Sequence, residues 1–89
     1  MYGVVHLMQY PEREDPTFLS LELFASFKDA EKRTRRIVKD FIEDYGEDFI
    51  EYATKESPVA IASNDEVTAY AYIAEVGGTV PKPQMALAQ

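Results

Sequence analysis

The strongest constraint on the fold is a helical pattern over residues 27–45. At about 100° per residue, its apolar and small side chains fall within an arc of roughly 140°. These side chains are Phe27, Ala30, Thr34, Ile37, Val38, Phe41, Ile42 and Tyr45. Ser26 precedes the pattern as a typical N-cap, with Asp29 three residues later, and Gly46 follows it as a typical helix stop. The sequence therefore predicts one amphipathic helix with a single buried face.

Strand patterns lie on both sides of this helix. Residues 2–10 are apolar and β-prone, and residues 11–17 form a charged loop that contains two prolines. In residues 18–25, Leu19, Leu21 and Leu23 alternate with Phe18, Ser20, Glu22 and Phe24, which predicts that the leucines share one face. After the helix, residues 59–62 and 67–76 alternate around a turn at residues 63–66. The sequence predicts a strand for each of these four segments.

Residues 47–55 fit two interpretations. Phe49, Ile50 and Ala53 suit a short second helix, and Glu47 and Asp48 would be favourable in its first turn. Ile50 and Tyr52 alternate as they would in a strand. We favour the helix, and the strand stays open.

These elements predict a small α+β fold. We expect an antiparallel sheet of about four strands, with one long amphipathic helix on one face, in the order β-β-α-(α)-β-β. Eighty-nine residues suffice for one domain. We expect a single compact domain over residues 1–78 and an extended, proline-containing C-terminal tail over residues 79–89.

The composition argues against catalysis, metal binding and a cofactor. The chain has no cysteine and one histidine, His6, so a thiol nucleophile and a thiolate zinc site are excluded. No Gly-x-Ser-x-Gly motif and no phosphate-binding glycine loop is present. Acidic residues flank Gly46, but their spacing lacks the calcium-loop pattern. A second helix that starts there, a basic partner or simple solubility explains them better than a metal does. We expect no enzyme.

The N-terminus has neither a basic region nor a long apolar run, and no stretch approaches the roughly 20 apolar residues that cross a bilayer. We expect an intracellular, cytoplasmic protein that is soluble.

The predicted sheet has a face that the helix does not cover. If Ala69, Ala71 and Ile73 point toward the helix, Tyr70 and Tyr72 point away from it. One helix covers one side of a sheet, so an aromatic surface is left for association. The residues that we expect to bind a partner are Tyr70, Tyr72, Tyr2, His6, Met85 and Leu87. We expect a homodimer or a subunit of a larger assembly. Two alternatives are that the tail or a second helix covers the face as core, and that the face binds nucleic acid or a ligand.

The polar side of the helix carries a basic strip, formed by Lys28, Lys32, Arg35, Arg36 and Lys39. This basic strip could bind phosphate or an acidic partner. It could equally be a solvated surface with ion pairs four residues apart, namely Asp29–Arg33, Glu31–Arg35, Arg36–Asp40 and Lys39–Glu43. The net charge of −7 disfavours nucleic acid and anionic membranes. We therefore favour a non-catalytic protein–protein interaction or structural subunit, with a nucleic-acid-associated regulatory protein as the alternative.

Overall fold

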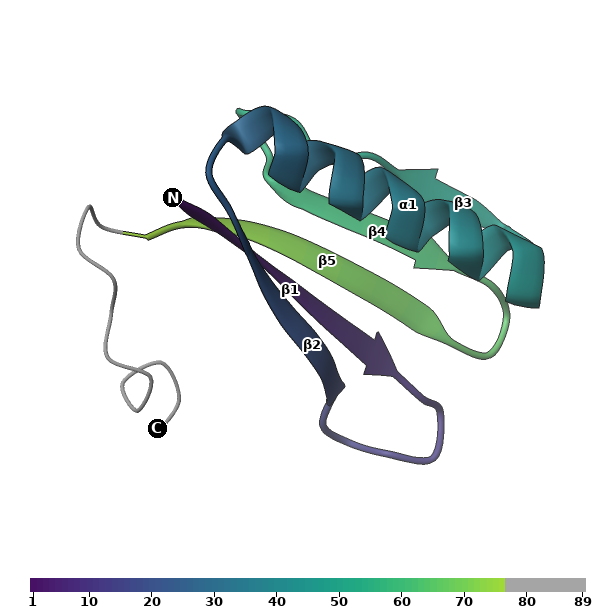
Figure 1. Ribbon diagram of the computed structural model, residues 1–89. Helices are drawn as coiled ribbons and strands as arrows, with labels where there is room; N and C mark the ends of the chain where they lie inside the picture. Colours follow the sequence, from purple (N-terminus) through teal and green to yellow (C-terminus); the bar gives the residue numbers. More distant parts are fainter. Residues whose placement is uncertain (77–89) are drawn as a thin grey trace.

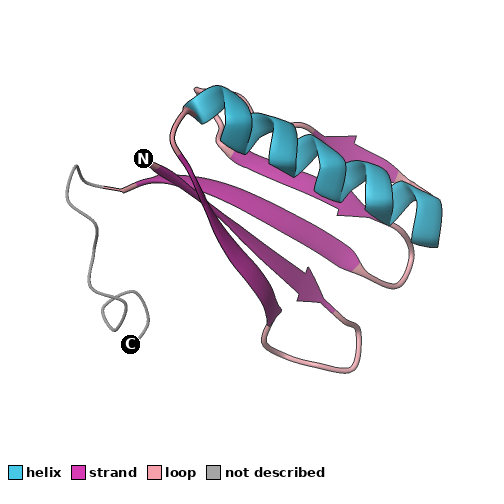
Figure 2. Ribbon diagram, in the orientation of Figure 1, coloured by secondary structure: helices cyan, strands magenta, loops and turns pink. Residues whose placement is uncertain are grey.

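The computed structural model describes residues 1–76, which form one five-stranded antiparallel sheet with one helix on one face (Figures 1 and 2). The elements are β1 (Tyr2–Gln9), β2 (Thr17–Phe24), α1 (Phe27–Tyr45), β3 (Phe49–Glu51), β4 (Val59–Ser63) and β5 (Thr68–Glu75). The strand order across the sheet is β2-β1-β5-β4-β3, so β5, the last strand of the described residues, lies at the centre. The predicted α+β class is confirmed.

The predicted helix is confirmed with both of its ends. Ser26 has extended backbone angles, and its side-chain oxygen accepts a hydrogen bond of 3.1 Å from the Asp29 N–H. Gly46 ends the helix with a φ of 76°, and its N–H donates to the Ile42 carbonyl at 2.9 Å. A positive φ is costly for residues that carry a Cβ atom, which explains glycine at this position.

The core lies between α1 and the sheet, and small side chains on the sheet let the helix approach. Ala60 and Ala62 on β4, and Ala69 and Ala71 on β5, are all buried. Helix residues Ala30, Ile37, Val38 and Phe41 pack against them from above. The buried Thr34 hydroxyl donates to the Glu31 carbonyl at 2.7 Å, so it brings no unpaired polar group into the core.

The segment for which we favoured a second helix contains a strand instead. Phe49, Ile50 and Glu51 form β3, which pairs antiparallel with β4. Phe49 lies opposite Ser63 and Glu51 lies opposite Ile61. Three residues of β3 are too few for a recognisable period, and pairing with β4 determines their conformation. The sheet therefore has five strands rather than about four.

An irregularity in β2 changes which of its side chains share a face. His6 pairs with Ser20 while Leu7 pairs with Phe18, so Leu19 is an extra residue in the ladder. Such a β-bulge reverses the alternation on its far side. Phe18 therefore shares a face with Leu21 and Leu23, and the predicted face of three leucines is wrong for Leu19.

The helix covers the sheet unevenly. It packs mainly on β5, β1 and β4 and less on β2. Figure 1 shows α1 lying over β4 and β5, with β1 and β2 diverging from it. Within residues 1–76, no helix is long and apolar enough to cross a membrane. The predicted tail at residues 79–89 lies outside the described residues.

Candidate interaction surface

The side of the sheet that faces away from α1 is mostly apolar. Alternation and strand register assign its residues, because Val4, Met8, Ala69, Ala71 and Ile73 are buried beneath the helix and their neighbours point the other way. We term this surface the open face. It consists of Gly3, Val5, Leu7 and Gln9 on β1, Phe18, Leu21 and Leu23 on β2, Phe49 and Glu51 on β3, Val59, Ile61 and Ser63 on β4, and Thr68, Tyr70, Tyr72 and Ala74 on β5.

Large apolar side chains of the open face are exposed to solvent. The exposed fraction runs from 38% for Tyr72 to 60% for Phe18, and Leu21, Leu23 and Phe49 lie between these values. Val5, Leu7, Tyr70, Val59 and Ile61 are partly buried by these neighbours. Within residues 1–76, no element packs over this side of the sheet (Figures 1 and 2).

Charge is nearly absent from the open face. Glu51, on the short strand β3, is the single charged side chain among its residues, although 28% of the chain is charged. The remaining polar groups are neutral, namely Gln9, Ser63, Thr68 and the two tyrosine hydroxyls. A surface exposed to water alone has no need to exclude charge in this way, and depletion of charge is characteristic of interface centres.

The open face is organised in rows that cross the strands. One row runs Leu21, Val5, Tyr72 and Val59, and the next runs Phe18, Leu7, Tyr70, Ile61 and Glu51. Directly opposed residues on neighbouring strands have Cβ atoms about 4.5–5.5 Å apart, so each row is a continuous line of contact. Tyr72 lies in the middle part of the first row, and Tyr70 lies in the middle of the second.

Gly3 lets the leucines of β2 lie flat on the open face. A Cβ atom at this position would be 3.3 Å from Leu21 Cδ1 and 3.6 Å from Leu23 Cδ2. The two leucine side chains therefore lean over the backbone of β1. They extend the apolar surface from Tyr72 toward the β2 edge of the sheet.

The structure divides the residues that we expected to bind a partner. Tyr70 and Tyr72 lie on the open face, as their alternation predicted. Tyr2 and His6 lie on the other side of the sheet, because they alternate with the open-face residues of β1. The Tyr2 ring packs edge-on against Phe27, with centroids 5.7 Å apart. Met85 and Leu87 lie outside the described residues.

Sequence reasoning missed several open-face residues, namely Leu21, Leu23, Phe18 and Phe49. Alternation groups the leucines on one face of β2, but it does not say which face the helix covers. A simple period of two puts Phe18 on the opposite face from the leucines, because it does not reveal a β-bulge. The usable signal was the absence of charge along these alternating positions.

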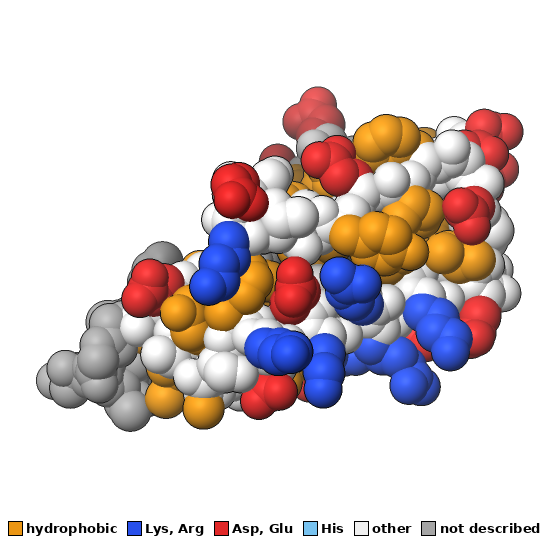
Figure 3. All heavy atoms as spheres, turned by 90° about the horizontal axis from the view of Figure 1, so that it is seen from above, with side chains coloured by type: hydrophobic (Ala, Val, Ile, Leu, Met, Phe, Trp, Pro, Cys, Tyr) orange, Lys and Arg blue, Asp and Glu red, His pale blue; other side chains and the backbone are white. Residues whose placement is uncertain are grey.

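The basic strip lies on the solvent side of α1, where acidic side chains are interspersed with it (Figure 3). Of the four predicted ion pairs, Arg36–Asp40 forms within residues 1–76, at 3.2 Å. Arg33 instead binds Glu22 of β2, and the Arg35 guanidinium lies 5.4 Å from the centre of the Tyr52 ring. Two members of the basic strip, Arg35 and Arg36, therefore have partners within the domain. The nucleic-acid alternative stays a prediction.

The acidic residues near Gly46 do not form a metal centre in the described part of the chain. No group of three or more side chains with the spacing of metal ligands occurs in residues 1–76. Asp48 lies beside Asp65, and a hydrogen bond with Asp65, together with its charge, raises the pKa of Asp48. A hydrogen bond between two carboxyl groups requires that one of them be protonated, and the repulsion between their charges acts in the same direction.

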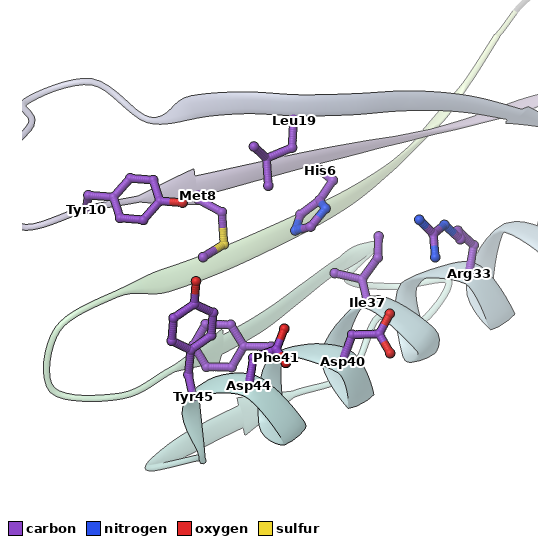
Figure 4. Close-up of a pocket in the computed structure, with 10 residues that line it drawn as sticks. All are labelled: His6, Met8, Tyr10, Leu19, Arg33, Ile37, Asp40, Phe41, Asp44 and Tyr45. Atoms are coloured by element: carbon purple, nitrogen blue, oxygen red, sulfur yellow. The ribbon is translucent and has the colours of Figure 1, made fainter.

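A pocket of about 190 Å³ lies on the helix side of the sheet, where β1 and β2 diverge from α1 (Figure 4). We term it the wedge pocket. Its lining residues are His6, Met8, Tyr10, Leu19, Arg33, Ile37, Asp40, Phe41, Asp44 and Tyr45. Burial and the nearby Arg33 guanidinium lower the pKa of His6, while Glu22 opposes that shift. His6 is therefore mainly neutral at pH 7, and no Ser, Thr, Cys or Lys side chain lines the pocket beside it.

No family model, no curated protein and no solved structure matches this chain.

Proposed function

We propose that this protein is a non-catalytic interaction subunit that associates with a second copy of itself through the open face. The observation that carries the proposal is a five-stranded surface with exposed Phe18, Leu21, Leu23, Phe49 and Tyr72 and with one charge. Exposed apolar patches of this kind mark association sites.

A partner for this surface has to be apolar and nearly uncharged. The open face offers hydrogen-bonding groups only at its tyrosines and its polar margin, so it cannot recognise a charged partner by complementarity. A second copy supplies a matching surface without any further component. In a two-fold pair the same patch serves on both subunits, and rows centred on Tyr70 and Tyr72 would meet near the axis.

The size of the open face supports such a pair. At about 3.3 Å per residue and 4.8 Å between strands, the described strands cover roughly 500 Å². Two copies would together bury roughly 1,000 Å², without the additional area that protruding side chains contribute. This total reaches the lower limit for a specific interface. Burial in a pair would also support a domain of only 89 residues, since small domains gain stability from oligomerisation.

The direct test is the mass in solution, measured by light scattering during gel filtration. We expect the mass of two chains of 10.1 kDa for the unmodified protein. The variant Tyr72→Glu should give the mass of one chain with an unchanged far-ultraviolet circular dichroism spectrum, because it places a charge at the centre of the open face.

The matched control is Tyr52→Glu. Tyr52 has a comparable exposure but lies on the helix side, beside Arg35 and Lys39, where a carboxylate is well placed. This variant should keep the mass of the unmodified protein. A mass of one chain for the unmodified protein at all concentrations, or an unchanged assembly in Tyr72→Glu, would refute the proposal.

A further inference from the structure

The wedge pocket results from the way the helix lies on a twisted sheet. Arg33, Ile37, Asp40, Phe41, Asp44 and Tyr45 form one stripe along α1. His6 and Met8 alternate along β1, Tyr10 directly follows that strand, and Leu19 is the bulged residue of β2. Figure 4 shows His6 and Met8 directed from the strand toward the helix, and the Tyr45 hydroxyl directed from the helix toward the strands. The walls are therefore fixed by elements of regular structure.

The base of the wedge pocket is apolar. Met8, Ile37 and Phe41 are buried residues of the core that also line the pocket. The volume of about 190 Å³ corresponds to roughly six water molecules at about 30 Å³ each. Water above such a base has few partners, and an apolar group of similar size would displace it favourably. The pocket thus suits a compact ligand rather than a drug-sized one.

The charged side chains around the wedge pocket favour the binding of a cation. Arg33 is bound by Glu22, and Asp40 is bound by Arg36. No ion pair occupies Asp44 within residues 1–76. Asp40 and Asp44 lie one turn apart near the C-terminal end of α1, and the last turn, which contains Asp44, has no basic residue to offset the negative end of the helix dipole. Asp44, which has no ion pair within residues 1–76, therefore lines the pocket at the C-terminal end of α1.

We propose that the wedge pocket binds a small primary amine with an apolar body. The ammonium group would lie at Asp44 and Asp40, near the rings of Tyr10 and Tyr45, which attract cations through their faces. The apolar body would lie on Met8, Ile37 and Phe41. The wedge pocket and the open face are on opposite sides of the sheet, so this proposal does not depend on the proposed function.

Three probes with the same ring but different charge test the ligand class. Phenethylamine carries an ammonium group, 2-phenylethanol is neutral, and 3-phenylpropionate is an anion. Backbone amide spectra of the ¹⁵N-labelled full chain should shift with millimolar phenethylamine, most strongly at residues of β1 and the C-terminal half of α1. The neutral and anionic probes should bind about two- to fivefold more weakly, which is the range that one exposed charge pair contributes.

The matched variants are Asp44→Asn and Glu43→Gln. Glu43 neighbours Asp44 in the sequence but lines a different pocket, beside Lys39. Asp44→Asn should weaken phenethylamine binding by about two- to fivefold, and Glu43→Gln should leave it unchanged. The same spectra report whether each variant is folded.

Three results would overturn this proposal: no shift with phenethylamine, equal binding of 2-phenylethanol, or shifts that map to the open face. The variant Tyr72→Glu separates the two proposals. It should dissociate the pair and leave phenethylamine binding intact.

Discussion

Tyr70 and Tyr72 stack on one another along β5, with ring centroids 6.1 Å apart and ring planes 17° apart. Residues two apart in a strand share a face, and β5 is the central strand of the sheet. The two rings therefore pack against each other at the centre of the open face, flanked by Val5 and Leu7 on one side and by Val59 and Ile61 on the other.

This arrangement predicts that a charge introduced at residue 70 weakens association more than the loss of the Tyr70 hydroxyl group does. Tyr70→Glu should raise the dissociation constant of the pair at least about tenfold, because it buries a carboxylate with no partner. Tyr70→Phe should keep the pair, since the ring is unchanged. Sedimentation equilibrium measures both constants, and equal values for the two variants would contradict the expectation.

The layer of alanines beneath the helix predicts a penalty for larger residues. Ala71 is buried on β5 under α1. Ala71→Leu should lower the free energy of unfolding by about 1–3 kcal/mol, because the added atoms force the helix away from the sheet. Urea denaturation measures the change. Glu75→Leu, an exposed position on the same strand that is not part of the open face, is the control that should leave unfolding nearly unchanged.

The N-cap predicts a local effect on helix stability. Ser26→Ala removes the acceptor of the Asp29 N–H and should cost about 0.5–2 kcal/mol. Ser26→Asp should retain most of the stability, because aspartate caps helices as well as serine does. If thermal unfolding places Ser26→Ala and Ser26→Asp at the same midpoint, the cap contributes nothing.

We expect His6 to contribute to the loss of stability at acidic pH. Burial, aided by Arg33 of α1 and opposed by Glu22 of β2, lowers the pKa of His6 below its ordinary 6.5 in the folded state. The unfolded chain then binds more protons just below pH 6.5, so the free energy of unfolding falls as pH decreases from 6.5 toward the folded pKa. His6→Gln should show a smaller fall between pH 7.5 and pH 5.5. An identical fall in both proteins would show that His6 is not involved.

The Asp48–Asp65 contact predicts the opposite dependence of stability on pH, namely a loss as the pH rises. Because Asp65 raises the pKa of Asp48 in the folded state, deprotonation of Asp48 lowers the free energy of unfolding as pH rises. Asp65→Asn should raise the thermal midpoint at pH 7, and the gain should shrink as the pH becomes acidic. Glu66→Gln removes a charge from the same turn without that contact. It should not reproduce the pH-dependent gain.

Much of the fold could be predicted from local sequence. The helix, its Ser26 cap and its Gly46 end follow from a period of 3.6 and from local capping chemistry, both of which are contained in 21 consecutive residues. Of the four longer strands, β1 follows from an apolar, β-prone run, and β2, β4 and β5 follow from alternation. The division of β5 into a small-residue face under the helix and a tyrosine face away from it also follows, since Ala69 and Ala71 suit close approach and Tyr70 and Tyr72 do not.

The candidate surface depended on contacts between distant residues. Which side of β1 faces the helix is decided by packing, and that decision separates Tyr2 and His6 from Tyr70 and Tyr72. The bulge at Leu19 brings Phe18 to the leucines, and it exists only as a mismatch between two paired strands. The wedge pocket likewise arises from the angle between α1 and the twisted strands β1 and β2, which no single segment encodes.

The sequence by itself therefore determined the helix and the four longer strands, together with the two faces of the helix and of β5, because periodicity is a property of neighbouring residues. The tertiary structure alone decided that Phe49–Glu51 joins the sheet, that β5 lies at its centre, and that the leucines and tyrosines form one uncharged surface. Strand pairing and register are set by residues far apart in the chain, and their energies have no local signature.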